Sequence, residues 1–398
     1  MSDIVTFGAV GDVAFTGETE ERMVEHGCDW PFERVRHLLE RADVLFGNME
    51  SVAIPGDYPE DEIDSAGMVS RIGGPEGAAA LKRAGFDFMN LAANHVLDAG
   101  TVGMFHTREC LEAAGLATGG VGAKQAEARR LITLEKAGLR FGFLCYGEDS
   151  NYTLGTTGPC YAYYELDSVL ADVAAARAAV DVLVVSIHAD IEFMPTPSVP
   201  RLENSRRIAR AGADIVLGHH PHVPQGVEMV GGSLIAHSLG NFVFNAHTSG
   251  YMKSHAPRTA SSFVLLVEIG SGGDVAGFER VPCRIGEPPE QRPAPLEGAA
   301  AAEMLGHFDE LDRHLADDEF LRDTWREVAR RHLAIYIKRA AEYDLDRVLD
   351  ELVGRLCLTA ENRSWMEEVL AMGRESWARQ AELRDEHHRP SRRFAKKG

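Results

Sequence analysis

The sequence predicts a layered α/β fold, and three observations support this prediction. Short apolar runs rich in β-branched residues alternate with segments of helical periodicity. Several apolar runs end in a cluster of carboxylate, amide or imidazole side chains. The last quarter of the chain is rich in Ala, Glu, Arg and Leu and has no strand signal. We therefore expect a sheet-containing domain that is followed by helices.

The first half of the chain alternates strand and helix. Apolar residues spaced as Phe32, Val35, Leu38 and Leu39 indicate a helix, and Gly115 ends another. A hairpin is expected to turn at 136–138. The predicted elements are a strand over Ile4–Val10, a helix over Pro31–Ala42, a strand from Asp43 to Phe46, a helix over Gly74–Ala84, a strand over Phe86–Leu91, a helix over Val102–Ala114, and hairpin strands at Leu131–Glu135 and Leu139–Tyr146.

The second half alternates less regularly, which predicts a mixed sheet. Its elements are a helix over Val169–Ala179, a strand over Val182–Ile187, a helix over Leu202–Ala211, and strands at Asp214–Leu217, Ser233–Ala236 and Ser262–Ile269. We divide the chain into a catalytic domain at 1–285, a Pro/Glu-rich linker at 286–295, a helical subdomain at 296–383 and a basic, disordered tail at 384–398. Trp325, Trp365 and Trp377 are expected on apolar helix faces.

The composition limits which classes of partner and which cellular compartment are expected. Lys plus Arg total 41 and Asp plus Glu total 61, so the formal charge is −20 and nucleic acid is an unexpected partner. Six scattered cysteines form no Cys-x-x-Cys pair, which is typical of a reducing compartment. No signal peptide and no apolar run near the ~20 residues of a membrane span is visible. We therefore predict a cytoplasmic protein with no membrane partner.

Polar clusters follow the predicted strands, where an open α/β sheet presents its ligand crevice. Carboxylate, amide and imidazole groups together suit a divalent metal, with mixed nitrogen and oxygen sets favouring Mn, Fe, Zn or Ni over Ca or Mg. The sequence fixes neither the metal nor whether one or two ions bind. Gly11, Gly47 and Gly218 are expected to let the chain turn off three strands. The clusters are Asp12, Asn48 with Glu50, Asn94 with His95, His188, and His219, His220 and His222.

These motifs resemble the CapA family of capsule-synthesis-type proteins, itself similar to the calcineurin-like metallophosphoesterases. The resemblance runs from Ile4 to Arg284 through Gly-Asp, Asn-Met-Glu, Ala-Asn-His-x-x-Asp, His188, Gly-His-His-Pro-His and Ser-Leu-Gly-Asn-Phe. It implies a two-sheet sandwich flanked by helices, with a metal centre at one edge. The helical C-terminal subdomain beyond this region is predicted from the composition alone.

The resemblance also implies roles for individual residues. Glu50 stands where a metal-bridging acid is expected, and His95 matches a histidine that acts on the substrate. The doubled histidine leaves open whether His219 or His220 is the ligand. The implied metal ligands are Asp12, Glu50, Asn94, His188, His220 and His222. The catalytic candidates are His95, Asp98, His219, Asp190 and Glu192.

Structural roles compete with these assignments. Asn94 fits a turn cap and Asp98 fits a cap for a helix starting near Thr101. Asp190 and Glu192 are either solvent-facing acids or site groups. The chain also departs from the superfamily pattern, because Val13 and Ala14 replace the histidine of the usual Asp-x-His motif. That departure puts a two-metal phosphoesterase reaction in doubt.

Three functions remain open. One is metal-dependent hydrolysis of a phosphoester or an amide. Another is a non-catalytic part in capsule or poly-γ-glutamate assembly. The lead hypothesis is modification of a peptide by α-carbon epimerisation, with a separate leader-peptide-binding protein as a further partner. Epimerisation requires stabilisation of charge at a carbonyl and two groups that exchange a proton with the α-carbon.

Overall fold

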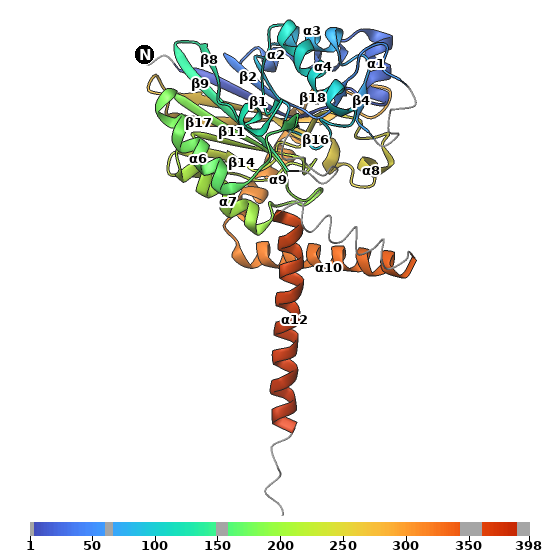
Figure 1. Ribbon diagram of the computed structural model, residues 1–398, viewed down its shortest axis with the longest axis vertical. Coiled ribbons are helices and arrows are strands. Elements are labelled where there is room, and N and C mark those ends of the chain that lie inside the picture. Colours follow the sequence, from blue (N-terminus) through green and yellow to red (C-terminus); the bar gives the residue numbers. More distant parts are fainter. Residues whose placement is uncertain (1–3, 60–66, 149–157, 343–359, 388–398) are drawn as a thin grey trace, which may run out of the picture. The chain divides into compact units, whose positions relative to one another are not determined.

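The computed structural model describes residues 4–59, 67–148, 158–342 and 360–387 (Figure 1). The chain folds into two compact units, Met1–Leu321 and Arg322–Gly398. The first unit contains two large sheets, and each of them mixes parallel and antiparallel strands.

The first sheet has eight strands in the order β18-β17-β16-β1-β2-β5-β6, with β15 paired to β1 as well. Strands β1, β2, β5 and β6 run parallel, whereas β16, β17 and β18 continue the sheet in antiparallel pairs. The strands are β1 (Val5–Val13), β2 (Val44–Met49), β5 (Phe88–Asn90), β6 (Ala117–Gly119), β15 (Asn241–Val243), β16 (Ser261–Ile269), β17 (Val275–Ile285) and β18 (Pro293–Pro295).

The second sheet has six strands in the order β13-β14-β12-β11-β9-β8. The predicted hairpin is confirmed, and Ala137 (φ 52°) and Gly138 (φ 81°) make its turn. The strands are β8 (Ile132–Lys136), β9 (Leu139–Gly147), β11 (Val182–His188), β12 (Ile215–His219), β13 (Val227–Val230) and β14 (Ser233–Ala236). Two short ribbons join β3 (Val52–Ala53) to β4 (Val69–Ser70) and β7 (Val121–Gly122) to β10 (Cys160–Tyr161).

The two large sheets pack face to face, which confirms the predicted sandwich. Phe88 of the first sheet stacks on Phe143 of the second with 4.1 Å between ring centroids. Phe7 stacks on Phe141 in the same way at 6.1 Å. The aromatic rings exclude water between the sheets and supply much of the apolar burial that stabilises the fold.

Helices cover the outer faces of the sandwich (Figure 1). Val173 of α6 and Ile208 of α7 pack in one buried cluster with Val185 and Ile187 of β11. The helices of this unit are α1 (Glu18–His26), α2 (Arg36–Leu39), α3 (Pro75–Ala84), α4 (Gly100–Ala113), α5 (Gln125–Ala128), α6 (Leu166–Ala176), α7 (Val199–Arg210), α8 (Gly250–Lys253) and α9 (Gly298–His314), with 3₁₀ turns at Trp30–Phe32, Arg177–Ala179 and Arg258–Ala260.

Two predicted segments differ in the structure. The continuous helix over Pro31–Ala42 is wrong, because a 3₁₀ turn and the short α2 replace it; Val35 (φ −110°, ψ −5°) stands between them. The four apolar side chains that predicted this helix are nevertheless buried. The 3₁₀ turn and α2 thus bury the same side chains that a continuous helix would bury. Pro293–Pro295, inside the segment interpreted as a linker, forms the edge strand β18. Proline is tolerated there because an edge strand needs fewer backbone donors.

Helix α9 belongs to the first unit, although composition placed the start of a helical subdomain at residue 296. Arg280 of β17 holds it there. The Arg280 side chain is 8% exposed and donates to both carboxylate oxygens of Asp312 at 2.8 Å and to Asp309 at 3.2 Å. Packing against β17 therefore decides where the first unit ends.

Replacing Arg280 with methionine is expected to lower the free energy of unfolding by about 3 kcal/mol, because Asp312 loses a mostly buried partner. The neighbouring pair between Arg41 and Glu279 is half exposed, at 45% and 54%, so Arg41→Met should cost less than about 1 kcal/mol. Urea unfolding, monitored by circular dichroism, measures the free energy of unfolding of both variants. Equal losses in the two variants would show that Arg280 does not anchor α9.

The second unit contains α12 (Ala360–His387) and most of α10 (Asp318–Glu342). Trp325 and Trp365 are buried as predicted, whereas the side chain of Trp377 lies outside the described residues. Residues 384–387 are helical rather than disordered, and the remainder of the predicted tail lies outside the described residues. In the described part of the chain, no helix combines the length and apolar character that crossing a membrane requires.

Candidate metal centre

Five predicted metal ligands converge at the carboxyl ends of parallel strands. Asp12 lies near the end of β1, Glu50 directly follows β2, and His188 ends β11. His220 and His222 follow β12. The first two come from one sheet and the other three from the second sheet, and all five side chains are buried. The sandwich thus brings together residues that lie up to about two hundred positions apart in the sequence.

The five residues form two groups that share one member. Asp12, Glu50 and His188 make one group, and Glu50, His220 and His222 make the other. Within each group, one nitrogen or oxygen ligand atom from every residue lies within 4.8 Å of the others. Glu50 belongs to both groups, which is the position of a carboxylate that bridges two ions. Two histidine nitrogens with carboxylate oxygens suit a divalent transition metal.

The Glu50 carboxylate supports this fit independently. Its side chain is 0% exposed, and neither carboxylate oxygen has a hydrogen-bond partner among the residues that the structure describes. Burial first, and then the negative charge of Asp12, raises the pKa of Glu50 well above its ordinary value. A buried acid without a donor is unfavourable unless a cation balances it. The residues present therefore fit a divalent ion.

His222 is held in the tautomer that a ligand needs. Its Nδ1 lies 3.0 Å from Oδ1 of Asn241, while the Asn241 amide donates to the carbonyl oxygens of His222 and Thr259 at 3.3 and 2.9 Å. These donations turn the amide oxygen toward the ring, so Nδ1 carries the proton. The Nε2 lone pair then faces Glu50, whose Oε1 is 3.4 Å away. Such a neighbour fixes ring orientation and ligand basicity.

Amide side chains hold His188 on both sides. Asn48 Nδ2 lies 3.0 Å from Nδ1 of His188 and 2.9 Å from Oδ1 of Asp12, and Asn94 Oδ1 lies 2.9 Å from Nε2 of His188. Asn90 in turn donates to Oδ1 of Asn48 at 2.6 Å. Asn94 therefore contacts a candidate ligand directly and lies where an ion near His188 would meet its oxygen.

Burial favours the neutral form of two imidazoles in these groups, those of His188 and His220. Burial, followed by the charges of the neighbouring histidines, lowers the pKa of His188 well below its usual range. Burial is also the main reason that the pKa of His220 falls to about 4. A neutral imidazole is the form that ligates a metal. His220 (φ 92°) and His222 (φ 58°) also have left-handed backbones, a strain that is typical of functional sites.

The structure separates His219 from its neighbour. His219 lies in neither ligand group, whereas His220 does. Its Nδ1 is 3.2 Å from Oδ1 of Asp12, and its ring stacks on Phe46 with 5.9 Å between centroids. Burial raises the pKa of Asp12, but the neighbouring imidazole of His219 outweighs this effect and lowers the pKa overall, so Asp12 is ionised. His219 thus supports Asp12, and a direct catalytic role for it stays a prediction.

His95 and Asp98 form a pair beside the ligand groups. Nδ1 of His95 lies 2.7 Å from Oδ2 of Asp98, which also accepts from the backbone N–H of Met68 at 2.5 Å. The alternative role of Asp98 as a helix cap is not realised, because α4 begins after Ala99 with no side-chain cap. The His95 side chain is 18% exposed, so it can meet a substrate.

Glu192, like His95, is a partly exposed side chain near the ligand groups. Its Oε1 is 3.7 Å from Nε2 of His222, and Tyr251 of α8 donates a hydrogen bond to its Oε2. Burial raises the pKa of Glu192, but the neighbouring imidazoles of His220 and His222 and the hydrogen bond from Tyr251 lower it overall. Its side chain is 28% exposed, so Glu192 is an ionised carboxylate that a substrate can reach rather than a free surface acid.

Asp190 has a different position. Its Oδ2 accepts from the backbone N–H of Ser198 at 2.8 Å, next to the start of α7, and Asp190 belongs to neither ligand group. Burial raises its pKa. Asp190 thus holds the loop that carries Glu192, and its assignment as a catalytic group stays a prediction.

The glycines near the clusters act through close backbone approach rather than through sharp turns. A Cβ on Gly11 would lie 1.9 Å from the carbonyl oxygen of Gly240, and one on Gly218 would lie 1.8 Å from that of His237. Neither glycine has a positive φ. The absence of side chains lets the strands that carry the ligands pack against neighbouring segments.

Three contributing residues received no role from the sequence: Asn90, Asn241 and Tyr251. Asn241 belongs to a recognised motif, but its hydrogen bonds depend on a loop that lies far away in the sequence. Asn90 ends a strand beside Asn48, so its place in the sheet was a usable signal. Tyr251 lies in a short helix with no pattern that marks it. These residues support the ligands rather than join them.

The comparisons identify the family. Residues 6–246 match the family described as "Bacterial capsule synthesis protein PGA_cap". The PGA biosynthesis protein CapA of Bacillus subtilis is 27% identical over 246 residues, covering 61% of this chain and 64% of that protein. The capsule biosynthesis protein CapA of Bacillus anthracis is 28% identical, covering 61% and 60%. The match thus spans less than two thirds of either relative.

Solved structures give more distant matches. A novel phosphatase from Mycoplasma pneumoniae has a TM-score of 0.44 at 12% identity and covers 73% of this chain and 97% of its own. A 5′-nucleotidase precursor from Thermus thermophilus has a TM-score of 0.43 at 13% identity, covering 77% and 59%. Values at this level say nothing about the reaction. The matched residues 6–246 make up more than half of the chain and contain both ligand groups, and this protein belongs to the bacterial capsule synthesis PGA_cap family.

Proposed function

We propose that this protein is a metal-dependent enzyme that modifies a peptide by moving a proton on and off an α-carbon. One observation carries the proposal: two partly exposed acid–base groups, His95 and Glu192, lie near a single set of buried metal ligands. Inversion at a carbon needs a group that removes the proton and a second group that returns one to the opposite face.

His95 is suited to one of these roles. Asp98 fixes the ring through Nδ1, which leaves Nε2 free to accept or donate a proton. A carboxylate in this position also stabilises the imidazolium that forms when the ring takes up a proton. The pair resembles the histidine–carboxylate arrangements that serve general acid–base catalysis on other folds.

Glu192 is suited to the complementary role. Its lowered pKa keeps it ionised and ready to accept a proton, and the hydrogen bond from Tyr251 holds its carboxylate in place. After protonation, Glu192 could return a proton to the second face. A histidine and a carboxylate with different environments are a common way to divide acid and base roles.

A divalent ion held by Asp12, Glu50, His188, His220 and His222 would supply positive charge that stabilises an anionic substrate carbonyl oxygen. Asn94 would help to hold it. The two ligand groups also exclude water, since all their side chains are buried. Proton transfer at a carbon next to that carbonyl then falls to His95 and Glu192.

The same arrangement and the family support the proposal of a peptide substrate. Two related proteins are named for PGA or capsule biosynthesis. A peptide chain offers the α-hydrogen and carbonyl that the site can act on, and a separate protein that binds a leader segment stays a proposed partner. The cytoplasmic location likewise stays a prediction.

Hydrolysis is a second candidate, and the shared position of Glu50 favours it. Two ions bridged by one carboxylate are the arrangement that activates water against a phosphoester or an amide. The missing Asp-x-His histidine argues against two equally tight ions, because Val13 and Ala14 supply no ligand atom. A non-catalytic role in polymer assembly is the outcome if neither reaction occurs.

The test uses the Mn²⁺-loaded protein in deuterated water. Linear L-peptides and γ-linked glutamate oligomers are incubated with it and then analysed by mass spectrometry and by chiral amino-acid analysis. We expect a mass gain of one deuterium at one residue, together with the inverted stereoisomer. Release of fragments would support hydrolysis instead, and turnover of p-nitrophenyl phosphate alone would support a phosphoesterase.

Substitution of the two acid–base groups sharpens this test. His95→Gln and Glu192→Gln should each reduce inversion by roughly 10²- to 10⁴-fold, because each removes one of the two groups that exchange a proton with the α-carbon. Each variant should still exchange deuterium into one stereoisomer of the substrate, and the two variants should differ in which one. The exposed residues His37 and Glu40, replaced with glutamine, serve as controls and should leave the rate unchanged. Full activity in both site variants would contradict the proposal.

A further inference from the structure

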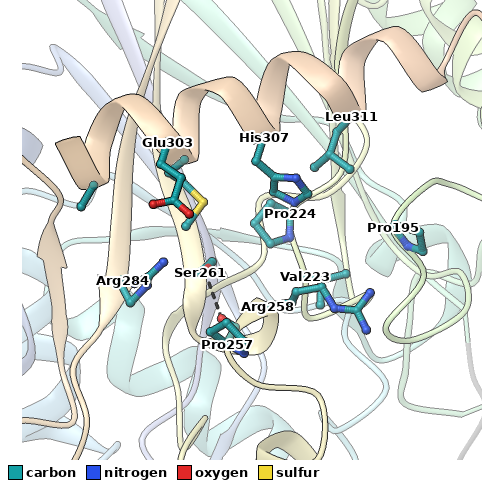
Figure 2. A pocket seen from close by; sticks show the side chains of 12 residues that line it. Pro195, Val223, Pro224, Pro257, Arg258, Ser261, Arg284, Glu303, His307 and Leu311 are labelled. Atoms are coloured by element: carbon teal, nitrogen blue, oxygen red, sulfur yellow. Dashed lines mark hydrogen bonds between the residues drawn. The ribbon is translucent and has the colours of Figure 1, made fainter.

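A pocket whose lining includes none of the candidate metal ligands lies under helix α9 (Figure 2). It has a volume of about 170 Å³. Met304 and Leu311 line it from α9, and Val223, Pro224 and Pro257 line it from loops of the sandwich. These side chains give it an apolar surface. All of its lining residues belong to the first compact unit.

Two arginines bring positive charge to this apolar surface. Arg284 of β17 and Arg258 of the 3₁₀ turn both line the pocket. Among the residues that the structure describes, neither guanidinium has a carboxylate within ion-pair distance, and Nε of Arg284 is buried without a hydrogen-bond partner. Arg258 is exposed, but Arg284 is half-buried, and most buried or half-buried arginines here have such a partner, for example Arg280 and Arg292. A buried donor without a partner is unfavourable and points to a missing acceptor.

The pocket is held open by its walls. Arg280 anchors α9 to β17 through Asp312, and Phe263 of β16 packs edge-on against Phe308 of α9 with 5.1 Å between centroids. The hydroxyl of Ser261 donates to the carbonyl oxygen of Pro257, which fixes the loop below (Figure 2). An occupant would therefore bind a preformed site, which lowers the entropy cost of binding.

We propose that this pocket binds a small carboxylate with an apolar, ring-sized body. A cavity of about 150 Å³ with an apolar lining accommodates benzene, so the pocket has room for one such ring. The guanidinium of Arg284, whose Nε lacks a partner, would receive the carboxylate, because arginine pairs with carboxylate through two parallel hydrogen bonds. Glu303 also lines the pocket, and its negative charge repels such an anion, which limits the affinity for the ligand.

The pocket touches the segments that hold His222. Val223 and Pro224 follow His222 directly in the chain. Arg258 precedes Thr259, whose carbonyl oxygen accepts the hydrogen bond of the Asn241 amide. The proposed ligand therefore contacts both segments that position a candidate metal ligand, but its binding requires no reaction at the metal centre.

Isothermal titration calorimetry of the Mn²⁺-loaded full chain with sodium benzoate tests this site. We expect one binding event per chain. Arg284→Met should weaken it by about 10-fold or more, the usual effect of losing a charge-assisted hydrogen bond, whereas Arg258→Met should weaken it less, because Arg258 is exposed at the other end of the pocket. Glu303→Gln should tighten it a few-fold by removing repulsion. Arg140→Met, which removes an exposed arginine from β9, is the matched control and should leave the affinity unchanged.

The outcomes separate this proposal from the proposed function. Benzoate that binds at the metal centre would survive Arg284→Met and be lost in Glu50→Gln, and this result would overturn the pocket assignment. If inorganic phosphate binds as tightly as benzoate, the ligand needs no apolar body, and that part of the proposal is overturned. Circular dichroism of each variant excludes unfolding as the cause of lost binding, and Glu303→Gln gives a gain that unfolding cannot mimic.

Discussion

Replacing Glu50 with glutamine is expected to abolish metal binding at both ligand groups. Glu50 is the one residue that belongs to both, and an amide cannot supply its negative charge. The wild-type protein should gain about 2.7 kcal/mol of stability at a metal concentration one hundred times the dissociation constant. Glu50→Gln should gain almost none. Elemental analysis of the dialysed protein and thermal unfolding with and without Mn²⁺ measure the two effects.

Glu50→Gln should have the opposite effect on stability when a chelator removes the metal. Glu50 is then a buried acid without a donor in the described part of the chain, next to the charge of Asp12, so its replacement should raise the free energy of unfolding. His188→Gln removes a ligand of one group only and should leave the other group with its metal. Glu40→Gln on the surface is the control. Unchanged metal content in Glu50→Gln would remove the basis for a bridged site.

Replacing Asn241 with leucine is expected to lower metal affinity by about 10- to 100-fold without removing any ligand atom. The Asn241 amide orients His222 and donates to two carbonyl oxygens. Leucine leaves those oxygens unpaired, which should also cost about 1–3 kcal/mol in the free energy of unfolding. Metal titration followed by calorimetry gives the affinity, and urea unfolding gives the stability.

A nearby amide provides the comparison for Asn241. Asn245 is half-buried and accepts one long hydrogen bond from Gln291 at 3.4 Å, and it belongs to neither ligand group. Asn245→Leu should leave metal affinity unchanged. A loss of stability with unchanged metal affinity in Asn241→Leu would show that Asn241 serves the loop alone and does not position His222.

Much of the site could be predicted because an apolar run followed by polar residues marks the end of each strand. The apolar run before His188 and the run before the doubled histidine are local signals, and parallel strands present their carboxyl ends at a common edge. The motif order then placed Glu50 and Asn94 in the same region. The two-sheet sandwich, the hairpin at Ala137 and the burial of the two described tryptophans were predictable for the same reason.

Other features depended on contacts that no local pattern contains. The choice between His219 and His220 as ligand rests on which ring faces Glu50, and the strand register decides that. Asp98 pairs with His95 instead of capping α4 because the turn between them brings the two side chains together. The segment at 31–42 buried the predicted side chains but formed two short turns, since burial alone does not require a continuous helix.

The chemical groups of the site, and the strand ends at which they lie, could be recognised in the chain alone, because hydrophobic periodicity and turn residues act over a few positions. Three arrangements could be found only in the folded protein: Glu50 belongs to both ligand groups, Asn241 sets the tautomer of His222, and two arginines line an apolar pocket under α9. These arrangements join residues from different sheets and loops. They arise from packing between distant segments, which no local pattern in the chain encodes.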